Sequence, residues 1–197
     1  MRSIAVESGT VAPLVCAFAN LVAVIAMALV LAPGTPLVAD LPVRELYIGE
    51  HLLAWRLGWA TWMIAAATLL WYYAWWRARV DGPQRAITIA SIGIAFDWAA
   101  EIALIVAGAD GYASIAPLAF FFTGAIANGF YTYAGIQLTF ATPLGPGARA
   151  YAGLMWAGGA LVSFAGLVNF PLLTAIGTAL LFALFIPWCV WSWRRLR

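Results

Sequence analysis

Long runs of apolar residues, separated by short breaks rich in Pro, Gly, Asp and Asn, dominate the chain. Six of these runs approach or exceed the roughly 20 residues that an α-helix needs to cross a bilayer. None of them alternates apolar with polar residues, as a strand of a membrane barrel does. The pattern therefore predicts six transmembrane helices. Their expected bounds are 11–31, 52–76, 86–107, 115–140, 151–169 and 172–193.

The composition agrees with this pattern. Of the 197 residues, 65% are hydrophobic and 9% are charged, and the mean hydropathy is +0.93. Soluble domains carry about 25% charged residues, and disordered chains are poor in apolar residues, so both classes are excluded. We expect an all-α integral membrane protein, with residues 1–197 forming a single six-span membrane domain, a bundle of transmembrane helices. The first run exceeds the ~7–15 residues of a signal-peptide core, so we interpret it as a true span.

The distribution of arginine predicts an orientation. All ten basic residues are arginines. With six spans both termini lie on one side, and most arginines fall on that side, so the positive-inside rule places both termini in the cytoplasm. We expect a multi-pass protein of the inner (plasma) membrane, and the Lys-free, Ala-rich composition suggests a bacterial source. The arginines on the terminal side are Arg2, Arg77, Arg79, Arg85, Arg149, Arg194, Arg195 and Arg197.

Aromatic residues cluster just before two of these arginine positions. One cluster precedes Arg77 and the other precedes Arg194. Trp and Tyr are enriched where helices meet the membrane–water interface, so we expect two aromatic belts at the cytoplasmic interface. The residues concerned are Trp71, Tyr72, Tyr73, Trp75, Trp76, Trp188, Trp191 and Trp193.

Several partners and cofactors are not expected. The arginines sit at helix ends and do not form one basic face, so we expect no nucleic-acid partner. Cys16 and Cys189 lack metal-ligand spacing, and we expect both to be free, buried thiols. One histidine, His51, cannot supply a bis-histidine haem or, with two distant cysteines, a tetrahedral zinc site. We therefore expect neither a cofactor nor a metal.

The segment 35–51 does not fit a plain loop between two spans. Asp40 is a suitable helix N-cap, and Pro42 fits the first turn. One helix from Leu41 to Arg77 would be about 55 Å long, against a hydrocarbon core of about 30 Å. We expect either an amphipathic helix on the outer surface that breaks near Gly49, or a second helix that projects beyond the bilayer. Asn169, at a later break, is expected to cap the sixth helix.

Three ionisable residues lie inside the expected spans, namely Arg56, Asp97 and Glu101. Such residues are costly in the membrane and are functional candidates by default. Asp97 and Glu101 are four residues apart and so share one helix face. Two carboxylates this close in a low dielectric should not both ionise. From the helix rise we expect Arg56 to pair with Glu101, with Asp97 deeper and either protonated or hydrogen-bonded.

Neutral polar residues are expected at a similar depth. Asn20, Asn128 and Tyr131 lie near the middle of the first and fourth spans, and His51 lies at the outer mouth of the second. Together with the ionisable residues they suggest a polar funnel that opens to the outside and narrows to Asp97. A stripe of tryptophans on the second span is interpreted mainly as packing. The predicted ligand-binding residues are Asp97, Glu101, Arg56, Asn20, Asn128 and Tyr131.

Three functions remain open from the sequence. The first is binding or translocation of a small solute, ion or lipophilic ligand. The second is a membrane-embedded enzyme acting on a lipid or isoprenoid, with Asp97 and Glu101 as acid and base and His51 as a further catalytic candidate. The third is a non-catalytic subunit or assembly factor of a membrane complex, whose charges pair with other proteins or with further copies of this chain. Within the bundle, the buried polar residues could also simply hold helices together. Binding or translocation is preferred because a single pair of acidic residues provides few catalytic groups for an enzyme. The expected partners are therefore the lipid bilayer and a small-molecule or lipid ligand.

Overall fold

Six long apolar helices make up most of the computed structural model, which describes residues 11–196. Within that range there is no strand, and the six-span prediction is confirmed to within a few residues at most helix ends. By length and composition the protein is of the multi-pass helical membrane type. The candidate spans are Ala12–Gly34, Leu52–Val80, Gln84–Ala107, Tyr112–Ala141, Pro146–Leu167 and Pro171–Arg195.

Two of the spans are not regular α-helices, which the sequence did not predict. The first span ends in a π-helical segment and a 3₁₀ turn, and the fourth contains a π-helical segment in its middle. The elements of the first span are α2 (Ala12–Ala26), η1 (Met27–Leu31) and η2 (Ala32–Gly34). Those of the fourth are α6 (Tyr112–Phe120), η3 (Phe121–Ala127) and α7 (Asn128–Ala141). The remaining spans are α4 (Leu52–Val80), α5 (Gln84–Ala107), α8 (Pro146–Leu167) and α9 (Pro171–Arg195).

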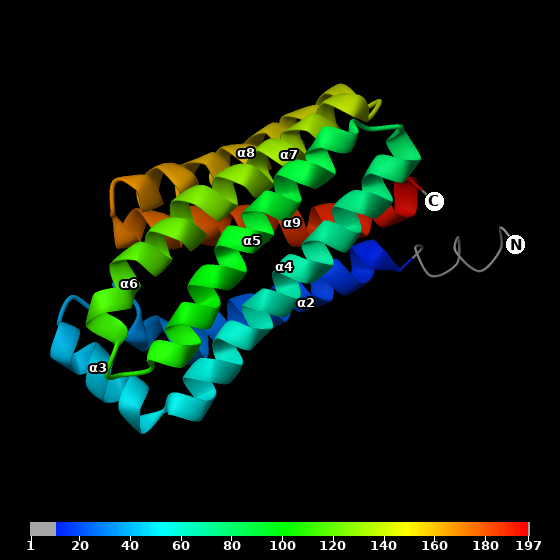
Figure 1. Ribbon diagram of the computed structural model, residues 1–197. Helices are drawn as coiled ribbons and strands as arrows, with labels where there is room; N and C mark the ends of the chain where they lie inside the picture. Colours follow the sequence, from blue (N-terminus) through cyan, green and yellow to red (C-terminus); the bar gives the residue numbers. More distant parts are fainter. Residues whose placement is uncertain (1–10, 197) are drawn as a thin grey trace, which may run out of the picture.

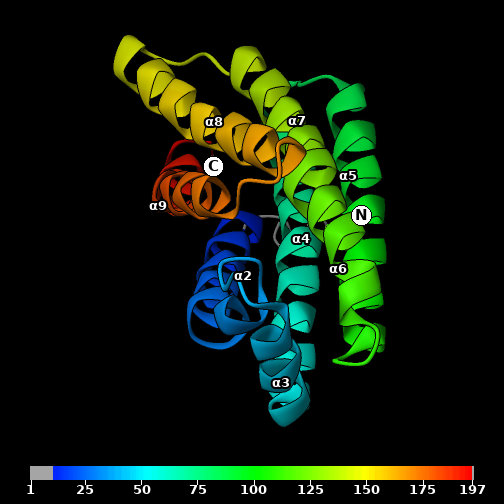
Figure 2. The same ribbon diagram turned by 90° about the vertical axis from the view of Figure 1, so that its left-hand side faces the viewer.

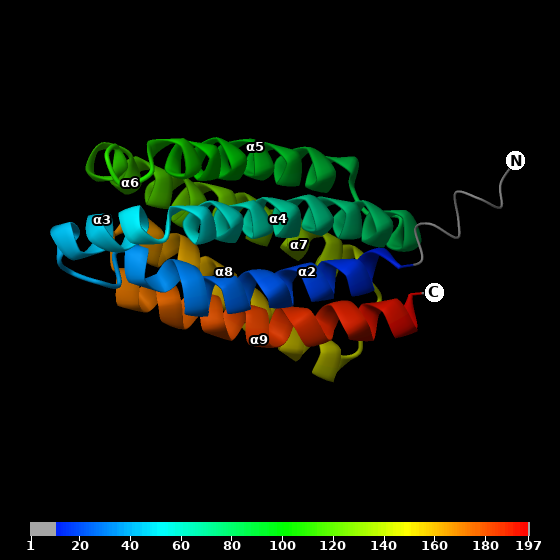
Figure 3. The same ribbon diagram turned by 90° about the horizontal axis from the view of Figure 1, so that it is seen from below.

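The helices run up and down, so that each span packs on the next one in sequence and α9 returns to α2 (Figures 1 and 2). Residues 11 and 196 lie at one end of the bundle, here called the terminal end, with the turns 81–83 and 142–145. The opposite end, here called the α3 end, carries α3 (Leu41–Glu50) and the turns 108–111 and 168–170. Figure 3 shows the same two ends from a second direction.

The turns between spans follow from local chemistry. Asp81 adopts the left-handed conformation (φ +51°), and the Gly82 amide donates to the Arg77 carbonyl at 3.0 Å, which closes the end of α4. Asn169 is also left-handed (φ +51°), a conformation that Asn tolerates better than most residues. It therefore helps to end α8, and the expectation that it caps the sixth helix is wrong, because α9 is preceded by Phe170.

The segment between the first two long spans forms the short helix α3, as the first of the two sequence-based alternatives expects. It begins directly after Asp40 and ends at Glu50, one residue beyond Gly49. The backbone at His51 (φ −121°, ψ 30°) breaks the helix before α4 begins. The Tyr47 hydroxyl donates to the Val30 carbonyl at 2.6 Å and ties α3 to η1, where the π-helical turns end.

Five of the eight residues of the expected aromatic belts instead belong to the core of the terminal end. Tyr72, Tyr73, Trp76 and Trp188 are each 2% exposed or less, and Trp75 is buried as well. Three of their polar atoms find partners inside the bundle: the Tyr72 hydroxyl bonds the Ser192 hydroxyl at 3.0 Å, the Tyr73 hydroxyl donates to the Tyr131 carbonyl at 3.0 Å, and the Trp76 indole donates to Thr142 Oγ1 at 2.9 Å. The belt prediction is wrong for these residues because α4 contacts α2, α5 and α7, so several of its faces meet protein instead of lipid. This group is called the terminal cluster.

A second apolar cluster lies toward the α3 end of the bundle. It includes Leu31, Ile48, Trp55, Leu104 and Tyr112, each fully buried. The Trp55 indole donates to the Leu104 carbonyl at 3.2 Å, which joins α4 to α5. Side chains of these two clusters border a space in the bundle that protein does not fill. The two cysteines are free and buried, as predicted.

Candidate functional site

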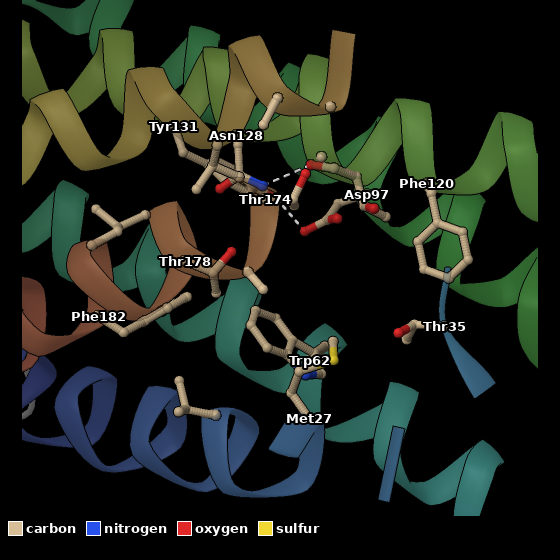
Figure 4. Close-up of a pocket in the computed structure, with 18 of the residues that line it drawn as sticks. Met27, Thr35, Trp62, Asp97, Phe120, Asn128, Tyr131, Thr174, Thr178 and Phe182 are labelled. Carbon is tan, nitrogen blue, oxygen red and sulfur yellow. Dashed lines mark hydrogen bonds between the residues drawn. The ribbon is translucent and has the colours of Figure 1, made fainter. Parts of the chain in front are cut away.

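A cavity of about 560 Å³ lies inside the bundle, next to the middle of α5 (Figure 4). Residues from all six spans line it. Its floor is formed by side chains that belong to or contact the terminal cluster, including Tyr73, Trp156 and Phe185. Toward the α3 end its lining reaches the segment 35–37 and the turn 169–171. The cavity therefore extends from the middle of the bundle to the loops at the α3 end.

Asp97 lines this cavity near the middle of α5. At 1.5 Å per residue it lies about 20 Å from the start of α5 and about 15 Å from its end. Its Oδ2 accepts a hydrogen bond of 3.0 Å from the Tyr131 hydroxyl, and Figure 4 shows the two side chains approaching each other. Gly93, one helical turn earlier, leaves room for the tyrosine ring, since a Cβ there would lie 2.8 Å from Tyr131 Cε1. Packing thus fixes the tyrosine that holds Asp97.

Glu101 lies on the same face of α5, one turn closer to the α3 end, and also lines the cavity. Its side chain is 1% exposed, and neither carboxyl oxygen has a hydrogen-bond partner among residues 11–196. Burying a polar group without a partner costs roughly 1–3 kcal/mol, and more for a charged group. Glu101 is therefore an energetic liability in the empty bundle.

Arg56 does not neutralise Glu101, so the expected ion pair is not formed. The Arg56 side chain is exposed and is not part of the cavity lining. Its Nε donates to the Ile105 carbonyl at 3.2 Å, on the neighbouring helix α5. The prediction failed because the helix rise fixes the depth of a residue but not its direction around the helix axis. Trp59 of α4 faces the cavity, and Arg56 does not.

The two asparagines predicted for the site both line the cavity. Each donates its amide to a carbonyl of its own span: Asn20 to Cys16 at 2.8 Å, and Asn128 to Thr123 at 2.7 Å. No hydrogen bond to either Oδ1 atom comes from the described residues. Both asparagines can therefore offer their Oδ1 as an acceptor to a ligand.

Both π-helical segments border the cavity. η1 contributes Met27, and η3 contributes Phe121 and Thr123. Segments of π-helix are frequent at functional sites, because the irregular backbone redirects side chains. At η3 the helix α8 approaches backbone to backbone, since a Cβ on Gly166 would lie 2.7 Å from the Ala125 amide nitrogen. A sequence-based reading of apolar runs does not reveal such a local change of helix type.

Tryptophans of α4 form part of the cavity wall. Trp59 and Trp62 line it, and their indole N–H groups are buried without a partner among residues 11–196. The Trp62 ring lies 5.5 Å from that of Phe182, measured between centroids. The stripe was noticed in the sequence, but its interpretation as mainly packing misses this role. His51, by contrast, stays outside the cavity, exposed, with its ring 4.7 Å from that of Tyr47.

Three residues of α9 belong to the site and were missed by the sequence analysis. Thr174, Thr178 and Phe182 all line the cavity and face its centre in Figure 4. They are spaced four residues apart, so they lie along one side of the helix. The signal was present in the sequence, because these two threonines are the polar residues nearest the start of an otherwise apolar span.

The cavity thus combines aromatic and aliphatic walls with two carboxyl groups and a few neutral polar groups. Among the described residues that line it there is no arginine, lysine or histidine. Such a site suits a largely apolar molecule that carries a small number of polar atoms. Fold and cavity together define a helical, multi-pass membrane-type protein with an internal pocket. No family, curated protein or solved structure matches the chain.

Proposed function

We propose that this protein binds a small, largely apolar ligand in the cavity between its six spans. The observation that carries the proposal is the cavity itself. Its volume of about 560 Å³ falls within the roughly 300–1,000 Å³ of small-molecule sites. Five of the six predicted ligand-binding residues line it, namely Asp97, Glu101, Asn20, Asn128 and Tyr131.

The ligand enters from the α3 end, and that end faces the outside of the cell. The cavity reaches the loops at the α3 end, whereas the terminal cluster closes it on the other side. The terminal end carries Arg77, Arg79, Arg85, Arg149 and Arg194, while the described arginines toward the other end are Arg44 and Arg56. By the positive-inside rule this asymmetry supports cytoplasmic termini in a plasma membrane.

Binding is common to a receptor-like protein and a carrier, and a carrier needs one further step. In a carrier, the side chains of Tyr73, Trp156 and Phe185, which form the floor of the cavity, would have to move apart to release the ligand toward the terminal end. The π-helical segments η1 and η3 lie beside the cavity, and irregular turns of this kind are places where a helix can change its local geometry. Translocation is therefore the extension of this proposal that a flux assay would test.

An enzyme is the second candidate, and one observation favours it. Asp97 is hydrogen-bonded to Tyr131, whereas Glu101 has no partner among residues 11–196, so the two carboxyl groups occupy different environments. Pairs of acids held in different environments serve as general acid and base. A lipid or isoprenoid substrate would fit the apolar walls. Turnover of such a substrate by the purified protein would favour this candidate. A role as a mere subunit does not account for the cavity.

Native mass spectrometry of the gently extracted protein tests the proposal. The wild type should carry a small bound molecule. The substitution Thr178→Trp fills the cavity from α9, and we expect it to reduce the bound fraction at least about tenfold, since overfilling opposes the ligand by more than 1.4 kcal/mol. Ile176→Trp is the matched control, because Ile176 is 52% exposed on the same helix and does not line the cavity.

The control variant should keep the ligand at the wild-type level. If Thr178→Trp binds the same molecule as fully as Ile176→Trp does, the ligand lies elsewhere on the protein and the proposal is wrong.

A further inference from the structure

We infer that the ligand of this cavity is an organic cation, a lipophilic amine or quaternary ammonium whose positive charge lies beside Glu101 and Asp97. This inference rests on the proposed function, because it assigns the chemical class of the molecule that the cavity binds.

The first observation is the unpartnered carboxyl group of Glu101. Its side chain is 1% exposed, it lines the cavity, and neither oxygen is hydrogen-bonded within residues 11–196. A buried acceptor in that state needs a donor that the described chain does not supply. Glu101 borders the cavity, and because both of its oxygens are covered by neighbouring atoms, a ligand there meets them once the side chain turns toward it. The unmet partner is therefore a group of the ligand.

The second observation is the charge of the lining. Asp97 and Glu101 share one helix face, and the described lining contains no basic side chain to balance them. Arg56, the partner that the sequence analysis expects for Glu101, is exposed and bound to the Ile105 carbonyl. An anionic ligand would meet like charge or acid groups here, which complementarity disfavours. A ligand that brings a positive charge supplies the missing partner for one carboxylate or both.

The third observation is the aromatic wall around the acids. Trp59 contacts Phe120 at 6.0 Å between ring centroids, and Trp62 contacts Phe182 at 5.5 Å. All four side chains line the cavity. Aromatic faces attract organic cations through their quadrupole, and tryptophan does so best. The same rings pack against the apolar body of the ligand. Walls of this kind suit a hydrophobic ammonium better than a hydrated metal ion.

A matched pair of probes tests the charge separately from the shape. The first probe is (4-phenylbutyl)trimethylammonium, and the second is its isostere in which a quaternary carbon replaces the nitrogen. A third probe, 4-phenylbutanol, offers a neutral hydroxyl donor. Binding to the full-length protein in nanodiscs is measured by equilibrium dialysis, with empty nanodiscs subtracted for partition into lipid.

We expect the wild type to bind the ammonium at least about tenfold more tightly than the isostere or the alcohol. The reason is that only the ammonium makes a contact between opposite charges with the carboxyl groups. Glu101→Gln should reduce that preference to less than about threefold, and Asp97→Asn should also lower it. Glu50→Gln removes the same charge from an exposed residue at the end of α3, outside the cavity, and should leave the preference unchanged.

Two outcomes overturn parts of the account and can be told apart. If the isostere or the alcohol binds as tightly as the ammonium, and Thr178→Trp removes the binding of all, the cavity is a ligand site but the cation inference is wrong. If Thr178→Trp changes the binding of no probe, the proposed function fails and the inference fails with it.

Discussion

Replacing Glu101 with methionine should make the protein more stable while weakening its binding of the ammonium probe. Glu101 is 1% exposed, and its two carboxyl oxygens have no partner among residues 11–196. Methionine has a similar length, has no polar group that needs a partner, and adapts to irregular spaces. The substitution removes an unsatisfied buried group and keeps most of the packing.

The expected size of the effect follows from the cost of leaving a buried polar group unpaired, about 1–3 kcal/mol. For a chain of 150–250 residues each kcal/mol corresponds to roughly 2–4 °C in the unfolding midpoint. We therefore expect a rise of several degrees. The general rule points the other way, because most single substitutions in buried positions lower stability. If Glu101 lowers the stability of the protein, its presence beside the cavity is best explained by a contribution to ligand binding.

Thermal unfolding in detergent measures the midpoint, and unfolding in mixed micelles of increasing SDS content measures the free energy. Both are recorded without added ligand. Glu50→Met is the control, since Glu50 is exposed and surface changes usually stay within about 0.5 kcal/mol. If Glu101→Met lowers the free energy of unfolding by 1 kcal/mol or more, Glu101 holds helices together, and the reasoning that assigns it to a ligand is refuted.

Three further predictions concern packing, charge and access. Gly166→Ala should destabilise the protein by about 1–3 kcal/mol because its Cβ would meet the η3 backbone at 2.7 Å, whereas Gly153→Ala on the same helix meets nothing within 4 Å and should be close to neutral in SDS unfolding. Arg56→Gln and Glu101→Gln should have additive effects on unfolding, within about 0.5 kcal/mol, because the two residues share no bond; a larger coupling would contradict the geometry. Thr178→Cys should react with a membrane-impermeant thiol reagent added to intact cells, and the ammonium probe should protect it; labelling only in inverted vesicles would reverse the orientation.

The positions of the spans could be predicted because the length of an apolar run is a direct consequence of bilayer thickness. The break after α3 was one of two alternatives, since a helix through to Arg77 would be far longer than the membrane and would either break or project beyond it. The depth of Asp97 also followed from counting residues along α5. These features depend on distance along one helix, which the sequence contains.

What could not be predicted depends on rotation and on neighbours. Arg56 lies at a depth suited to Glu101 but points away from the cavity, and only the packing of α4 on α5 determines that direction. The aromatic residues from Tyr72 to Trp76 resemble an interfacial belt in sequence, yet they are buried because α4 packs against α2, α5 and α7. The π-helical segments have no signature in hydropathy. Thr178 belongs to the site because α9 packs beside the cavity, and the sequence does not indicate that position.

The central claim is that this bundle holds a ligand whose positive charge meets Glu101. The most direct measurement is a cryo-EM structure of the protein in nanodiscs, bound to the ammonium probe, at a resolution that shows side chains. The account predicts density for the probe inside the cavity, against Trp62 and Phe182, with its nitrogen in contact with the Glu101 carboxyl group. A probe seated only on the lipid-facing surface, or a bundle in which side chains close the cavity and hydrogen-bond Glu101, would contradict it.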